Sequence, residues 1–272
     1  MSKRTQNEDI ESYILHLLEI HTRVTVSELC EKFGLASSTV RKKLSELEQQ
    51  GQLIRSYGGA ISVDANRDET MEQKSRINLP QKKAIASAAI ELIDDGDTLV
   101  LTGGSTVAEL CVYLRKLKNS TILTNSIVVA NLIMDNPNLE VRINSGIVRG
   151  RTGCIVGPTA CNLFESTHVD KAFVSCDAFD MEHGAFSSNI LVGKVEHCAI
   201  MSASQRYLLC DSSKLNKHGI SPFLPMKELT ALITDDDADP YYINDLRQSG
   251  LEVIVAPVFR MKKTIRDIQD SY

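Results

Sequence analysis

The stretch TVSELCEKFGLASSTVRKKL, residues 25–44, contains the signals for two helices and a tight turn between them. It begins with a capping box, in which the Thr25 hydroxyl accepts a hydrogen bond from an amide one turn later and Glu28 reaches back. Gly34 can supply the turn, because glycine adopts backbone conformations that other residues avoid. Val40 and Leu44 in its second half, and Leu47 just after it, recur at helical spacing. The stretch therefore predicts a helix-turn-helix.

The flanking residues extend this motif into a small domain. Upstream, one more amphipathic helix is predicted by apolar residues at helical spacing: Ile10, Ile14, Leu17 and Leu18. Ser37 or Ser38 can cap the second helix of the motif. Downstream, two β-prone runs joined by four residues predict a hairpin, or wing: Leu53–Arg55 and Ala60–Val63. Together these elements predict a winged helix-turn-helix over residues 1–63.

The second helix of the motif carries hydroxyls and cations on its outer face. They gather in its N-terminal half and comprise Ser37, Ser38, Thr39, Arg41, Lys42 and Lys43. Side chains at this place on a recognition helix contact base edges and phosphates of DNA. Arg55 and Tyr57 on the hairpin can add contacts to the same duplex. The alternative to DNA binding is a three-helix capping domain whose basic run is only a solvated face. Residues 1–63 hold eight basic and eight acidic residues and are neutral overall. The basic start of this helix favours DNA binding.

Composition narrows the class of protein. The chain of 272 residues is longer than one compact domain usually needs, and its net charge of -5 argues against non-specific coating of nucleic acid. No apolar run approaches the roughly 20 residues of a membrane span, and the N-terminus lacks a signal-peptide core. Seven scattered cysteines without a C-x-x-C pair predict buried thiols in a reducing cytoplasm. We therefore expect a cytoplasmic protein with no membrane segment.

Metal and cofactor sites are not predicted. The six histidines show no paired metal spacing. The acidic run Asp235-Asp236-Asp237, followed by Asp239, could bind a divalent cation, but its place before Pro240 is more typical of a helix start. We therefore expect neither a metal nor a cofactor.

Beyond the first domain, residues 64–79 are polar and charged and predict a partly helical linker. Pro80 suits the first turn of a helix, so the second domain is placed at residues 80–272. Seven β-branched runs follow within it: 98–101, 121–123, 140–143, 171–175, 207–210, 231–234 and 252–255. Amphipathic stretches lie between several of them, at residues 107–117, 127–134 and 239–249. This alternation predicts an α/β fold with a mainly parallel sheet covered on both faces.

Polar residues follow four of these strands, where ligands bind in parallel α/β sheets. They are Thr102, Gly103, Gly104, Ser105 and Thr106, then Thr124, Asn125 and Ser126, then Asp177, and finally Asp211, Ser212, Ser213 and Lys214. The glycines allow close approach of a ligand, and Ser105, Thr106 and helix-start amides can bind an anion. Lys214 can neutralise a phosphate, while Asp177 and Asp211 can accept hydrogen bonds from sugar hydroxyls. The turns together predict a site for a phosphorylated polyol, although the Gly-Gly-Ser-Thr turn alone also fits an ordinary strand-to-helix connection.

Both parts of the chain resemble one family. The N-terminal stretches that carry the resemblance are Val26–Leu29, Phe33–Leu35, Thr39–Lys42, Leu53–Arg55 and Gly58–Ala60. They resemble the DNA-binding domain of the DeoR family of bacterial sugar-metabolism repressors. The second domain resembles the sensor domain of the same family, through Gly104–Thr106, Thr124–Ser126, Thr152–Pro158, Asp170–Phe173 and Asp211–Lys214. The resemblance implies a sensor fold like ribose-5-phosphate isomerase, a sugar phosphate as effector, and a homo-oligomer, either dimer or tetramer.

The chain departs from the family pattern at several positions. In the first domain, Ala36, Lys43 and Tyr57 replace the usual serine, acid and histidine, and Lys43 makes the helix more cationic. In the second, Thr102 stands where an aspartate is common. At Lys194 and Glu196 the usual acidic and basic positions are exchanged, so we expect the two to pair in the opposite sense and Lys194 to belong to the effector site.

We therefore expect a DNA-binding transcriptional regulator, a repressor of carbohydrate-metabolism genes, that binds double-stranded operator DNA and a small phosphorylated sugar and is not an enzyme. One alternative is a sugar-phosphate isomerase on the same fold, with Asp177, Glu196 and Lys214 as its acid-base groups. Another is a regulator whose sensor has lost its ligand and serves only to oligomerise, which the departures at Thr102, Lys194 and Glu196 motivate.

Overall fold

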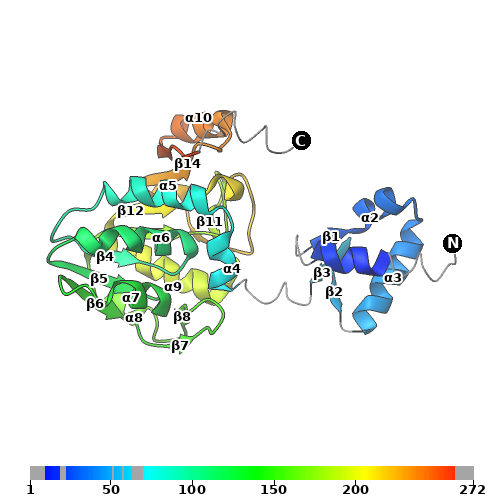
Figure 1. Cartoon of the computed structure of the whole chain (residues 1–272), viewed down its shortest axis with the longest axis horizontal. Coiled ribbons are helices and arrows are strands. Elements are labelled where there is room, and N and C mark those ends of the chain that lie inside the picture. The colour runs from blue at the N-terminus through cyan, green and yellow to red at the C-terminus, as the bar shows by residue number, and fades with distance from the viewer. Residues whose placement is uncertain (1–9, 19–22, 51, 57, 63–69, 261–272) are drawn as a thin grey trace, which may run out of the picture. The chain divides into compact units, whose positions relative to one another are not determined.

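The computed structural model describes residues 10–18, 23–50, 52–56, 58–62 and 70–260. The chain divides into two compact units, residues 1–68 and 69–272, and each is described by itself (Figure 1). Among the helices in the described ranges, none has the length and apolar character needed to cross a membrane.

The first unit is a helix-turn-helix with a small antiparallel sheet. Its elements are a helix at residues 10–18, β1 (Arg23–Thr25), α2 (Val26–Phe33), α3 (Ser37–Gln49), β2 (Leu53–Ser56) and β3 (Gly59–Ser62). The predicted capping box is confirmed, because Thr25 and Glu28 cap α2 reciprocally and Gly34 follows with φ 62°. The hairpin β2–β3 is confirmed as well, and β1 adds a third strand that the sequence did not reveal, giving the order β1-β3-β2.

The predicted cap of α3 is wrong. Ala36 occupies the N-cap position without a side-chain hydrogen bond, and Ser37 is already the first helical residue. Since a cap must stand just outside the helix, neither Ser37 nor Ser38 can act as one, and both are exposed. The inner stripe holds as predicted, because Val40, Leu44 and Leu47 are buried in the core of this unit.

The second unit is built on a seven-stranded parallel sheet. Its strands are β4 (Thr98–Leu101), β5 (Ser120–Thr124), β6 (Leu139–Ile143), β9 (Val169–Ser175), β12 (Ala203–Leu209), β14 (Ala231–Asp235) and β15 (Glu252–Ala256). They lie in the order β15-β14-β12-β9-β4-β5-β6, and every neighbouring pair is parallel. These are the seven runs that the sequence predicts as strands.

Helices cover both faces of this sheet (Figure 1). One face packs against α5 (Leu79–Ile90), α6 (Ser105–Tyr113) and α7 (Ile127–Ile133), and the other against α8 (Asn162–Glu165), α9 (Ile190–Met201) and α10 (Pro240–Gln248). Leu99 and Leu101 enter the first core, while Val100 between them enters the second. This alternation explains why β4 carries consecutive apolar residues, since both of its faces are buried.

Shorter elements complete the unit. They are α4 (Met71–Arg76), β7 (Ile147–Val148), β8 (Ile155–Val156), β10 (Ala178–Asp180), β11 (Gly184–Ser187) and β13 (Ser221–Leu224). Three 3-10 turns accompany them, at Leu114–Lys116, Ser212–Lys214 and Met226–Glu228. A separate antiparallel sheet has the order β10-β11-β13. These strands have two to four residues, too few to show a period in the sequence.

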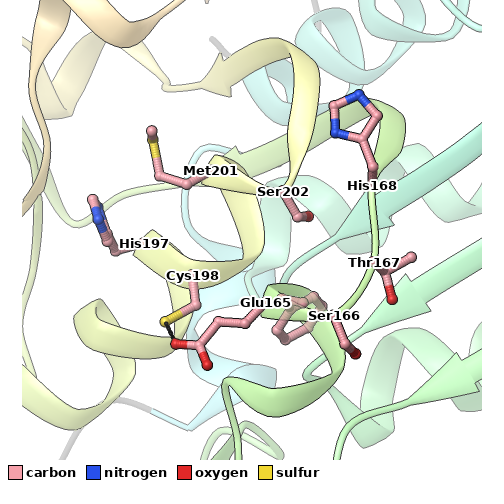
Figure 2. Close-up of a pocket in the computed structure, with 9 residues that line it drawn as sticks. Glu165, Ser166, Thr167, His168, His197, Cys198, Met201 and Ser202 are labelled. Carbon is pink, nitrogen blue, oxygen red and sulfur yellow. Dashed lines mark hydrogen bonds between the residues drawn. The ribbon is translucent and has the colours of Figure 1, made fainter.

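The prediction that all seven cysteines are buried thiols is wrong. Cys161 and Cys198 are joined as a disulfide between the start of α8 and α9, and Cys30 is only half-buried. Figure 2 shows Cys198 beside Glu165, whose carboxylate lies 3.8 Å from its sulfur. The two cysteines are far apart in sequence, so only the packing of the two helices brings them together.

Candidate functional site

The start of α3 presents the hydroxyls and cations that the sequence predicts for DNA contact. Ser37, Ser38 and Thr39 are exposed in its first turn. Arg41 and Lys42 are exposed too, and neither forms an ion pair with another residue in the described ranges. Because no side chain caps the helix, its first amides also face outward with the hydroxyls, an arrangement suited to phosphate.

Lys43 is the exception on this helix. Its ammonium lies 2.7 Å from Glu11 and 2.9 Å from Glu46, and its side chain is only 12% exposed. The hydrogen bonds to Glu11 and Glu46 raise the pKa of Lys43 against the opposing effect of burial. Lys43 therefore fastens α3 to the helix at residues 10–18, and the expected gain of free positive charge is cancelled by these acids.

The wing is tied to α3 by Arg55. Its amide donates to Glu48 at 3.0 Å and its guanidinium to Ser45 at 2.7 Å, while the side chain stays largely exposed. Tyr57, which was predicted beside it, lies outside the described residues. Arg55 thus fixes the position of the hairpin relative to the recognition helix.

In the second unit, the turns after β4 and β5 lie side by side. The Gly103 amide donates to the Asn125 side-chain oxygen at 2.9 Å, which joins the two turns. A Cβ on Gly104, where φ is 138°, would lie 2.0 Å from the Ser175 hydroxyl. A Cβ on Gly103 would lie 2.4 Å from the Cys154 sulfur. A side chain at either position would force these neighbours to move, so the two glycine turns are closely packed.

This turn pair holds hydrogen-bond donors that the protein does not use. The Thr106 hydroxyl and the Asn125 amide nitrogen are buried and have no hydrogen-bond partner among the described residues. The first amides of α6, from Ser105 onward, have no carbonyl one turn earlier to bond. Gly104 is the N-cap and provides no side-chain acceptor for them. The end of β4 therefore offers several donors to an anion.

Other predicted residues of these turns serve the fold. Thr102 is fully buried, and its hydroxyl lies 3.4 Å from the Gly103 carbonyl. Thr124 accepts from the Ser126 amide at 3.1 Å, and Ser126 in turn caps α7 by accepting from Val129. Thr102, Thr124 and Ser126 are thus buried and stabilise the two turns by hydrogen bonds within them.

A charged cluster lies at the same edge of the sheet. One oxygen of Asp177 accepts from Lys74 at 2.8 Å and the other from the Ser188 amide at 2.8 Å. Burial acts to raise the pKa of Asp177, but the charges of Lys74 and Lys214 lower it to about 2. Lys214 donates to the Cys176 carbonyl at 2.7 Å and lies 3.8 Å from Asp211. Two ammonium groups thus lie beside two carboxylates.

Glu196 completes this cluster as a neutral acid. The side chain is 5% exposed, and it hydrogen-bonds to Ser187. Burial and the negative charge of Asp177 raise the pKa of Glu196 to about 8, although Lys74 and Lys214 oppose the shift. At neutral pH Glu196 is therefore mostly protonated and adds little repulsion toward an anion.

The segment that follows the first unit is docked on this cluster. Lys74 belongs to α4 and contacts Asp177, and Asn78 donates to Asp211 and to Ser213, both at 3.0 Å. The buried ammonium of Lys82 stabilises the segment by donating hydrogen bonds to the carbonyls of Lys74 and Ile77. Residues 71–82, part of which the sequence assigned to a linker, are therefore built into the candidate site.

Lys194 is not brought into the cluster. It is exposed on α9, two residues from Glu196 and thus on another side of the helix, and no ion pair joins the two among the described residues. Lys194 instead borders a groove of about 470 Å³ together with His183, Ile190 and Phe223. The cluster gains Lys74 instead, which sequence reasoning missed because it lies 103 residues from Asp177.

Comparison with known proteins identifies the family of this chain. Residues 77–236 match the DeoR C terminal sensor domain, and residues 11–66 match the DeoR-like helix-turn-helix domain. The chain belongs to the DeoR family. This membership confirms the resemblance and the expectation of a DNA-binding regulator with a winged helix-turn-helix and an α/β sensor domain.

Relatives of this DeoR-family chain carry the names of regulators and repressors, not of enzymes. The HTH-type transcriptional regulator GlpR of Haloferax volcanii is 33% identical over 234 residues, 85% of this chain and 90% of that protein. The lactose phosphotransferase system repressor of Staphylococcus epidermidis is 32% identical over 229 residues, 82% of this chain and 90% of its own. Among solved structures, ribose 5-phosphate isomerase A of Methanocaldococcus jannaschii matches with TM-score 0.37 and 20% identity, over 49% of this chain and 53% of that one.

Proposed function

We propose that this chain is a repressor of carbohydrate-metabolism genes whose operator binding is controlled by a phosphorylated sugar in its second unit. The observation that carries the proposal is a set of buried donors without protein partners that lies at the same edge of the sheet as two lysine side chains. The buried donors of Thr106 and Asn125 lie at this edge, and Lys74 and Lys214 lie beside Asp177 at the same edge. A buried donor without a partner is costly, and a ligand oxygen would satisfy it.

Each end of a sugar phosphate has suitable partners here. The phosphate fits the start of α6, where free amides, Ser105 and Thr106 act as donors. Lys74 can exchange part of its bonding with Asp177 for the ligand, and Lys214 part of its bonding with the Cys176 carbonyl. A phosphate is a strong acceptor of such charge-assisted hydrogen bonds. Asp177 and Asp211 can then accept from sugar hydroxyls. Because Glu196 is mostly neutral, it adds little electrostatic repulsion against a phosphate dianion.

The position of α4 supports a coupling between the effector site and DNA binding. A ligand that displaces Lys74 from Asp177, or Asn78 from Asp211, loosens the segment that leads from the first unit into the second. Operator DNA and the sugar phosphate then favour different arrangements of this segment. By linkage, each weakens the binding of the other by the same factor. We infer that a dimer or tetramer presents two recognition helices to the two halves of an operator.

The test is calorimetry of the whole chain against phosphorylated aldoses and ketoses, beginning with ribose 5-phosphate. We expect one ester to bind and Lys214→Ala or Ser105→Ala to remove the binding, while the exposed Lys217→Ala leaves it unchanged. Conversion of the ester into another sugar phosphate would instead support the isomerase alternative. Absence of binding across the panel would support a sensor that only oligomerises.

A further inference from the structure

Three ligating side chains outside the effector site converge in the second unit: Asp180, His183 and His218. Their ligand atoms all lie within 4.8 Å of one another. Asp180 ends β10, His183 lies in the turn to β11, and His218 lies in the loop before β13. Histidine spacing along the sequence could not predict this cluster, because the pairing of short strands creates it.

The backbone around the cluster is held in place. Asp180 accepts from the His183 amide at 2.7 Å, which fixes the turn between β10 and β11. Gly184 follows with φ 83°, and a Cβ there would lie 2.1 Å from the Leu224 carbonyl, so the turn has little freedom. The Lys217 amide donates to the Phe179 carbonyl at 3.0 Å, which places the neighbouring His218 beside β10.

Asp180 brings a buried negative charge that is not fully satisfied. The residue is 6% exposed. Its Oδ2 atom is buried without a correctly oriented hydrogen-bond donor among the described residues, although the Nδ1 atom of His218 lies 2.6 Å away. Its Oδ1 atom lies 3.3 Å from Nδ1 of His183. Burying a carboxylate is costly unless a cation or hydrogen bonds compensate it, so the arrangement favours a positive ion here.

The donor set selects the kind of cation. Two imidazole nitrogens and one carboxylate oxygen suit zinc and the neighbouring divalent transition metals, whereas magnesium and calcium prefer oxygen alone. The side chains of His183 and His218 are 46% and 72% exposed, so an ion can enter from solvent and water can complete its coordination. Phe186 packs below both rings, at 5.8 Å and 6.0 Å between centroids, and limits their movement.

We propose that Asp180, His183 and His218 bind a divalent transition-metal ion of the zinc class. Ligand atoms in a tetrahedral site lie about 3.3 Å apart when the bonds are about 2.0 to 2.1 Å long. Nδ1 of His183 lies at this spacing from Oδ1 of Asp180. Nδ1 of His218 lies 2.6 Å from Oδ2, the other oxygen of Asp180, so its exposed ring must move outward to bind the same ion. The proposal does not depend on the sugar-phosphate site.

A second cluster could compete for the same metals. Cys161, Glu165 and Cys198 also converge, and Cys198 and Glu165 line a pocket of about 540 Å³ with His168 and His197 (Figure 2). Its two sulfurs are joined as a disulfide, which offers no thiolate to a metal. Reduction would release them, so the experiment must separate the two clusters.

The test is a titration of the untagged, chelator-treated whole chain with Co²⁺, followed by visible and near-ultraviolet absorption without reductant. We expect one ion per chain, d–d bands and no thiolate charge-transfer band. His183→Ala and His218→Ala should each weaken binding by about tenfold or more, whereas His168→Ala and Cys198→Ser should bind as the wild type does. Circular dichroism of the metal-free variants would show that the fold persists.

The proposal is overturned if the wild type binds no Co²⁺, or if both histidine variants bind it with unchanged affinity. A charge-transfer band that disappears in Cys198→Ser would assign the metal to the cysteine cluster and would equally overturn it. Zn²⁺ should displace Co²⁺ and bleach the d–d bands, since zinc occupies the same ligand set.

Discussion

Replacing Glu196 by glutamine tests the protonation of the buried cluster. Glutamine keeps the size of the side chain and its capacity to hydrogen-bond with Ser187, but it cannot ionise. In the folded chain the pKa of Glu196 is raised from 4.5 to about 8, first by burial and then by Asp177. Between these two values the folded state holds a proton that the unfolded state has released.

The sign and size of the effect follow from linkage. The stabilisation from Glu196 is complete below its unfolded pKa and is lost as the pH rises through the folded pKa. The free energy of unfolding of the wild type should therefore fall, relative to Glu196→Gln, by about 1.4 kcal/mol per pH unit within this window. Between pH 5.5 and pH 7.5 the variant should gain roughly 3 kcal/mol on the wild type.

The assay is urea unfolding at several pH values, followed by circular dichroism and tyrosine fluorescence. The chain has no tryptophan, and Tyr207, stacked on Phe173 at 4.9 Å in the sheet core, reports on the second unit. Glu182→Gln is the matched control, because that side chain is 82% exposed and should leave the pH dependence unchanged. Parallel stability curves for the wild type and Glu196→Gln would refute a protonated Glu196.

Two further predictions concern the DNA-binding face and the glycine turn. Arg41→Ala should weaken operator binding and reduce the slope of log K against log salt concentration by about one phosphate contact. Lys43→Ala should leave that slope unchanged, because Lys43 is paired with acids. Anisotropy titrations at several salt concentrations measure both slopes. Equal loss of slope in the two variants would contradict this assignment. Gly104→Ala should lower the free energy of unfolding by about 1 to 3 kcal/mol, since its φ is 138° and its Cβ would meet Ser175. Gly150→Ala, where a Cβ meets nothing within 4 Å, should change it little, and equal melting shifts would refute the packing argument.

The parallel sheet could be predicted because burial on both faces leaves a strong trace in the sequence. The clearest trace is a run of consecutive apolar residues, as at Leu99 to Leu101, which enter two different cores. The turns at the strand ends could be located for the same reason. Their placement at one edge follows from parallel order alone.

The rest depends on contacts between distant segments. Lys74 and Asn78 appear in the sequence as part of a polar linker, and only the docking of α4 brings them to Asp177 and Asp211. Lys43 appears as one more cation until its pairing with Glu11 is known. The cluster of Asp180, His183 and His218 likewise requires strands too short to leave a pattern. Local sequence thus specifies the elements, while long-range pairing specifies the charges that stay free.

The most direct test of the account is an anisotropy titration of the whole chain on an operator selected from random DNA, with and without the sugar phosphate that calorimetry identifies. The account predicts that the ligand lowers the operator affinity of the wild type by about 5- to 150-fold, and that operator DNA lowers ligand affinity by the same factor. Lys214→Ala should bind the operator as the wild type does and show no response to the sugar phosphate. An unchanged operator affinity at saturating ligand, or a full response in Lys214→Ala, would contradict it.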